Sequence, residues 1–135
     1  MGLDQYAYVA TRASQLDDYY RALETDGAEK VTEPREIAYW RKHPNLQGWM
    51  QRLWLRKGGD ATHTEFNGVE LELTREDIDE LEEDIKSGYM ASLHTRGFFF
   101  GDTKDEYYRD KDLNFVRTAR AELFCGLRVF YNSSW

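Results

Sequence analysis

The 135-residue sequence has a single cysteine, Cys125, which excludes an intramolecular disulfide and any metal site built from several thiolates. Cys125 follows Leu123 and Phe124 in an apolar stretch, so we expect it to be a buried small hydrophobic residue. Long apolar runs are lacking as well, and no segment approaches the roughly 20 apolar residues of a membrane-spanning helix. These absences favour a reducing compartment and argue against a membrane span.

The N-terminal residues also lack a targeting signal. They contain neither a positively charged region nor an apolar run, so no secretory signal is expected. A myristoylation signal beginning at Gly2 would need Ser or Thr at the position of Tyr6. We therefore expect a soluble protein of the cytoplasm.

Basic residues are outnumbered, because 18 Lys and Arg face 25 Asp and Glu, which gives a net charge of -7. Nucleic-acid phosphates attract Lys and Arg, so nucleic-acid binding is a disfavoured interpretation. Aromatic residues, by contrast, make up 15% of the chain. Much of this content must form the core, because exposing all of it would promote association.

Hydrophobic patterning predicts four strands and one further short segment. Alternating residues predict strands at 5–12 and 69–73, and the apolar run 97–101 between two glycines is most simply a buried strand. A last strand is expected at 127–131, and residues 36–40 are expected to form a short extended or turn segment.

Three helices are predicted from apolar residues at helical spacing. The first covers 44–57, because Pro44 suits the first helical position and a full apolar stripe follows. The second follows Thr74 as its N-terminal cap and ends at Gly88. The third begins near 107 or 110 and ends near 124.

These elements predict one α+β domain over residues 1–135, with a mainly antiparallel sheet of about four strands packed against about three helices. The mostly polar segment 13–34 leaves two alternatives open. It forms a short helix around 17–21, or it is a mobile excursion from the domain.

The segment before the first predicted helix is the main candidate for a site. Arg41, Lys42 and His43 precede Pro44, so two cations and an imidazole meet the free backbone N–H groups of a helix N-terminus. One interpretation is a bound phosphate or carboxylate; the other is that the cations pair with acidic side chains. Trp40 likewise permits stacking with a base or sugar, or a contact within the protein.

Familiar catalytic and metal-binding motifs are lacking. His43, His63 and His94 do not have the spacing of a zinc site. Acidic residues that follow 97–101, such as Asp102, do not match the calcium-binding EF-hand pattern. No phosphate-binding loop or nucleophile elbow occurs. We therefore expect neither a metal nor a cofactor, and whether the chain is an enzyme stays open.

Four sequence blocks, MGLDQY, YWRK, GFFFG and YNSSW, occur in this order along nearly the whole chain. Together they resemble a family of small proteins from bacteriophages, cyanophages included, and from bacterial genomes. Members typically open with MGLDMYL, carry YWRK before a short helix, contain GFFFG and end in YxSSW or SSWW. The resemblance implies a phage-encoded protein that acts in the host cytoplasm. The family has no established activity, so no catalytic residue carries over.

One position departs from the family pattern. Relatives often place His two residues before the helix Trp, whereas this chain has Gln47 there and His43 one helical turn earlier. A catalytic role for the family His would therefore be lost or relocated in this chain.

The order of aromatic and hydrogen-bonding blocks at the ends of predicted elements allows two structural alternatives: a shared pocket, or a small core that locks the termini. The pocket alternative assigns ligand binding to seven residues, namely Trp40, Arg41, Lys42, His43, Asp102, Tyr107 and Ser133.

Two functional hypotheses follow. The first is a non-enzymatic phage accessory protein that binds a host or phage protein through an aromatic-rich surface, as a homo-oligomer. The second is a small enzyme or ligand-binding protein for a small molecule that carries a phosphate or carboxylate.

Overall fold

The computed structural model describes residues 2–24, 32–90, 93 and 105–135, with the side chains of 105–107 excepted. Within these residues, four strands form one antiparallel sheet in the order β2-β1-β4-β3, accompanied by four helices. The prediction of a small α+β domain with one antiparallel sheet is confirmed. The strands are β1 (Asp4–Ala10), β2 (Arg35–Arg41), β3 (Leu71–Leu73) and β4 (Arg128–Ser134); the helices are α1 (Gln15–Glu24), α2 (Pro44–Arg56), α3 (Arg75–Ser87) and α4 (Asp105–Phe124).

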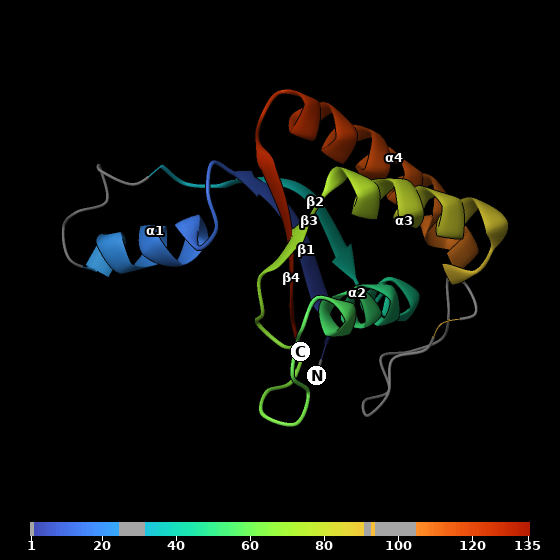
Figure 1. Ribbon diagram of the computed structural model, residues 1–135, viewed down its shortest axis with the longest axis horizontal. Coiled ribbons are helices and arrows are strands. Elements are labelled where there is room, and N and C mark those ends of the chain that lie inside the picture. Colours follow the sequence, from blue (N-terminus) through green and yellow to red (C-terminus); the bar gives the residue numbers. More distant parts are fainter. Residues whose placement is uncertain (1, 25–31, 91–92, 94–104) are drawn as a thin grey trace.

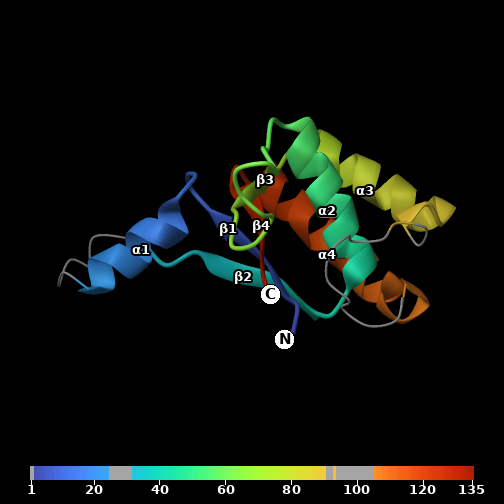
Figure 2. The same cartoon turned by 90° about the horizontal axis from the view of Figure 1, so that it is seen from below.

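Three of the helices share one side of the sheet. Figures 1 and 2 show α2, α3 and α4 grouped together, while α1 lies apart from them. Strand residues alternate between the two faces. Ala7, Val9 and Tyr131 join the main core beneath α2–α4, whereas Tyr8 and Phe130 form a second cluster on the opposite face.

Local sequence explains the helix boundaries. Pro44 begins α2, and residues 44–50 are all buried, so this half of α2 is enclosed on every side. Thr74 caps α3, because its hydroxyl accepts from the N–H of Asp77 and the Asp77 carboxylate accepts from the N–H of Thr74. Gly88 ends α3 at φ 85°, a left-handed conformation that favours glycine.

The edge of the sheet at β2 is partly covered. The hydroxyl of Tyr108 on α4 donates to the backbone carbonyl of Arg41. Arg35, at the other end of the strand, pairs with Glu122 of α4 at 2.7 Å. Side chains that occupy or flank an edge strand discourage its pairing with another chain.

Residues 15–24 adopt the helical alternative for the segment 13–34 as α1, and the strand predicted at 97–101 lies outside the described residues. The expectation of a buried Cys125 is wrong. Helix α4 ends at Phe124, which is 91% exposed, and the turn that follows carries Cys125 into solvent. None of the helices in the described part of the chain has the length and apolar character required to cross a membrane.

Candidate functional site

A buried histidine–carboxylate pair lies where β2 passes into α2. His43 directly precedes α2, and Lys42 has a left-handed backbone (φ 59°) that turns the chain from the strand into the helix. Nε2 of His43 lies 2.7 Å from Oδ2 of Asp112 on α4. The two side chains are 0% and 1% exposed. The pair therefore joins the β2–α2 junction to α4 inside the protein.

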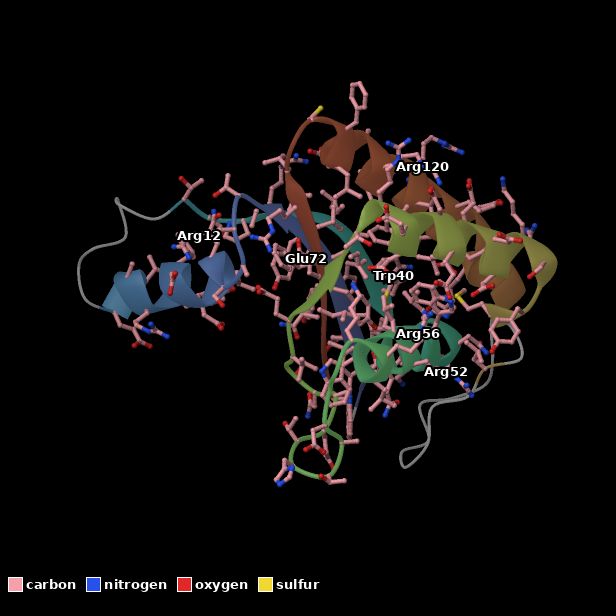
Figure 3. The ribbon with its side chains drawn as sticks, viewed as in Figure 1. Arg12, Trp40, Arg52, Arg56, Glu72 and Arg120 are labelled. Atoms are coloured by element: carbon pink, nitrogen blue, oxygen red, sulfur yellow. The ribbon has the colours of Figure 1, made fainter. Side chains whose placement is uncertain are left out.

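Trp40 and Tyr108 complete the surroundings of this pair. The indole N–H of Trp40 donates to Oδ1 of Asp112 at 2.9 Å, so the carboxylate is held through both oxygens. The ring of Tyr108 stacks on the imidazole of His43 with centroids 4.3 Å apart. Figure 3 places Trp40 between the sheet and the helices that cover it.

The hydrogen-bond pattern assigns the proton of a neutral His43. An ionised Asp112 can only accept, so Nε2 of His43 is the donor and Nδ1 is left as an acceptor. Nδ1 is buried and has no hydrogen-bond partner among the described residues. Such a dyad has the components of a general base. Its burial, however, leaves external molecules no access, so the pair is structural in this conformation.

Gln5 of β1 connects the β2–α2 junction to the sheet through hydrogen bonds. Its Nε2 donates to the backbone carbonyl of His43 at 3.1 Å and to the Tyr131 hydroxyl at 2.9 Å, while its Oε1 accepts from the His43 N–H at 2.9 Å. The Tyr131 hydroxyl donates in turn to Oε1 of Gln47 at 2.6 Å. Burial raises the pKa of Tyr131 well above its ordinary value, which keeps the phenol protonated.

Three of the sequence-predicted site residues belong to this buried network or lie beside it. Trp40 and His43 contact Asp112 directly, and Ser133 is 1% exposed on β4, opposite Gln5 in the strand register. Ser133 follows Tyr131 by two residues on β4. The hydrogen bond from Gln5 of β1 to Tyr131 of β4 therefore joins residues near the two ends of the chain beside these three site residues.

The other predicted residues are placed differently. Arg41 and Lys42 are exposed, and neither makes an ion pair or hydrogen bond through its side chain with a described residue. Asp102 lies outside the described residues, as does the side chain of Tyr107. The structure therefore separates the two cations from the buried Trp40 and His43.

Sequence reasoning did not select Asp112, although its position carries a signal. It occupies an apolar position of α4, because the buried residues of this helix recur at helical spacing. A carboxylate at such a position is rarely buried unless it is paired. The apolar neighbours that define the pattern are Tyr108, Phe115, Val116 and Ala119.

A surface hollow adjoins the buried pair. Its volume is about 520 Å³, and it is lined by Tyr39, Arg41, Tyr108, Asp110 and Lys111. The Tyr108 ring separates this hollow from His43, on which it stacks. Like Arg41, Lys111 has no acidic partner among the described residues.

The sheet face away from α2–α4 carries two aromatic pairs. Tyr6 of β1 and Tyr39 of β2 are cross-strand partners with ring centroids 5.3 Å apart. Tyr8 stacks on Phe130 of β4 at 5.6 Å. Of the described helices, only α1 adds an apolar residue to this face, where Leu16 packs against the second pair. Tyr39 is 37% exposed.

Comparisons of the chain with protein-family models, with curated proteins and with solved structures found no match. The described residues contain no group of three or more His, Cys, Asp or Glu that could hold a metal ion. The function is therefore inferred from the geometry of the chain itself.

Proposed function

We propose that this chain is a phage-encoded accessory protein that binds a host or phage protein in the host cytoplasm. The observation that carries the proposal is the aromatic face of the sheet, defined as Tyr6, Tyr8, Tyr39 and Phe130. Tyrosine is enriched at protein interfaces because it combines a large apolar ring with a hydroxyl that can be hydrogen-bonded.

The positions of the ionisable and aromatic side chains support binding over catalysis. The imidazole and carboxylate that could form a general base, His43 and Asp112, are enclosed in the core. On the aromatic face, in contrast, Tyr8 and Phe130 are buried, whereas Tyr6 is half-buried and Tyr39 is 37% exposed. A ten-residue helix is marginal without packing, and Tyr20 and Leu23 of α1 are 56% and 49% exposed. A partner protein on this face would bury Tyr6 and Tyr39 together with these α1 residues.

The proposal is tested by capture from bacterial lysate with the purified chain and a Tyr6→Ala/Tyr39→Ala variant. Truncation of aromatic hot spots should lower the amount of captured partner by roughly tenfold or more. Tyr89→Ala is the matched control, because Tyr89 is 49% exposed after α3, away from the sheet. Sedimentation analysis of the same proteins measures self-association through this face.

The capture and sedimentation results distinguish whether this face binds a protein. A partner that depends on Tyr6 and Tyr39 and not on Tyr89 supports the proposal, and so does loss of a dimer in the double variant alone. Equal capture by all three proteins, together with a monomer in every case, overturns it.

A second candidate function is binding of a small phosphate- or carboxylate-bearing molecule at the Arg41–Lys111 hollow. The specific observation is that neither cation pairs with an acidic side chain in the described part of the chain, although the net charge is -7. Pyrophosphate should then raise the melting temperature of the wild-type protein and not that of Arg41→Ala/Lys111→Ala. Arg52→Ala, an exposed cation on α2, is the control. An equal response of all three proteins, or no response, rejects this candidate.

A further inference from the structure

A second hollow lies on the aromatic face between the sheet and α1. Its volume is about 390 Å³, within the range of ligand-sized clefts. Tyr6 and Tyr8 of β1 and Tyr20 of α1 line it, and two glutamates, Glu33 and Glu36, come from the start of β2 and the residues before it. Three aromatic rings and two carboxylates therefore surround one space.

The charge in this hollow is of one sign. Among the described residues, its lining includes no basic side chain, and neither Glu33 nor Glu36 makes an ion pair or hydrogen bond through its side chain. Other carboxylates nearby are engaged: Glu70 accepts from Tyr8 at 2.7 Å, and Glu72 pairs with Arg128. The two glutamates thus present uncompensated negative charge beside the tyrosines.

The acidic surroundings affect the pKa of a tyrosine that lines the hollow. Burial, together with the negative charges of Asp4 and Glu36, raises the pKa of Tyr6 above its ordinary value. Tyr20 contributes to the same shift, which brings α1 and β1 together at this hollow. An added negative group would be repelled here, and a cation would be attracted.

Aromatic rings and carboxylates recognise the same class of ligand. The face of a tyrosine ring attracts Lys and Arg cations, Arg more often, and a guanidinium can also donate hydrogen bonds to two carboxylates. A purely aliphatic side chain would remove water from Glu33 and Glu36 without replacing its hydrogen bonds, which is unfavourable. We propose that the hollow lined by Tyr6, Tyr8, Tyr20, Glu33 and Glu36 binds an arginine side chain of the partner protein. This inference rests on the protein-binding function proposed above and names the chemistry that the partner presents.

The test is an NMR titration of the full chain with N-acetyl-arginine amide. We expect millimolar binding, with the largest amide shifts at Tyr6 and at Asn132, which also lines the hollow. N-acetyl-citrulline amide has nearly the same shape without the charge, and it should cause much smaller shifts. Glu33→Gln/Glu36→Gln should weaken arginine binding by roughly fivefold. Both glutamates are exposed and make no ion pair with the residues that the structure describes, so this variant should fold normally.

Two further variants complete the test. Tyr20→Leu keeps an apolar side chain on α1 but removes the ring, and it should also weaken binding. Glu76→Gln/Glu83→Gln neutralises two exposed glutamates of α3 and should leave binding unchanged. Equal shifts with arginine and citrulline, or equal binding by the Glu33/Glu36 and Glu76/Glu83 variants, overturn the inference.

Failure of this inference is distinguishable from failure of the proposed function. Partner capture that is lost in Tyr6→Ala/Tyr39→Ala but kept at full strength in Glu33→Gln/Glu36→Gln rejects the arginine site alone. Specific arginine binding without any partner or dimer that depends on Tyr6 and Tyr39 supports the hollow as a cation site and rejects the function.

Discussion

Nε2 of His43 and Oδ2 of Asp112 lie 2.7 Å apart, although the two residues are 69 positions apart in the sequence. Both side chains are almost completely buried, and Trp40 donates to the second carboxylate oxygen. Three elements, β2, α2 and α4, therefore depend on one carboxylate for their mutual position. The same contacts that exclude His43 from solvent make it a measurable determinant of stability.

Replacement of Asp112 by Ala should destabilise the protein by about 3 kcal/mol or more. The substitution leaves the N–H donors of Trp40 and His43 buried without acceptors, and each such loss costs about 1–3 kcal/mol. Asp112→Asn keeps one acceptor oxygen and should cost less. Urea unfolding followed by tryptophan fluorescence measures both changes.

The control for Asp112→Ala is Asp110→Ala on the same helix. Asp110 is exposed, and its replacement should change the free energy of unfolding by no more than about 0.5 kcal/mol. Equal destabilisation by the two substitutions would show that the buried hydrogen bonds contribute nothing specific.

Stability should fall above pH 10 because of Tyr131. Burial raises the pKa of this phenol in the folded protein, whereas the unfolded chain releases its proton near pH 10. The contribution is complete below pH 10 and is lost as the pH rises towards the folded-state pKa. The slope from this one group is at most about 1.4 kcal/mol per pH unit. Urea midpoints measured from pH 8 to 11 report it.

The variant Tyr131→Phe isolates the contribution of the Tyr131 phenol to the pH dependence of stability. The variant should lose about 1–3 kcal/mol at neutral pH, because Gln5 and Gln47 lose a buried partner. It should also have a shallower decline above pH 10 than the wild type. Tyr20→Phe, an exposed tyrosine, should alter neither property. An unchanged alkaline slope in Tyr131→Phe contradicts the assignment.

Periodicity predicted the scaffold because each element carries its own signal. The apolar stripe and Pro44 indicated α2, and Thr74 with Gly88 indicated the limits of α3. The full extent of β2 was less evident, because the burial of its residues does not alternate regularly and its pairing with β1 includes a bulge after Ala7.

The burial of the predicted site residues could not be predicted from local sequence patterns. The sequence placed Trp40 to His43 at a helix N-terminus, but their burial is produced by Asp112 and Gln5, which are distant in the chain. Strand register sets Gln5 opposite Trp40, and register is a property of the folded sheet. A polar residue at an inward strand position and an acid at an apolar helix position were the only local signals.

Cys125 should react with a thiol reagent in the native protein. It lies in the exposed turn after α4, so one equivalent should be labelled without denaturant. In a Cys125→Ser background, Ala119→Cys supplies the contrast, because Ala119 is 0% exposed on the same helix. That thiol should react only on unfolding. Slow native labelling of Cys125, similar to that of the buried thiol, would argue that the turn is covered.

Removal of the α3 cap should weaken the protein by about 1 kcal/mol. Thr74→Ala deletes the hydroxyl that accepts from Asp77, while Thr74→Ser keeps it and should restore most of the stability. Thr64→Ala, an exposed threonine before β3, makes the same chemical change outside a helix cap. Because α3 packs on α4, loss of the cap should lower the urea midpoint of the whole domain rather than fray α3 alone. Circular dichroism and tryptophan fluorescence would then give coincident transitions, and separate transitions would contradict this coupling.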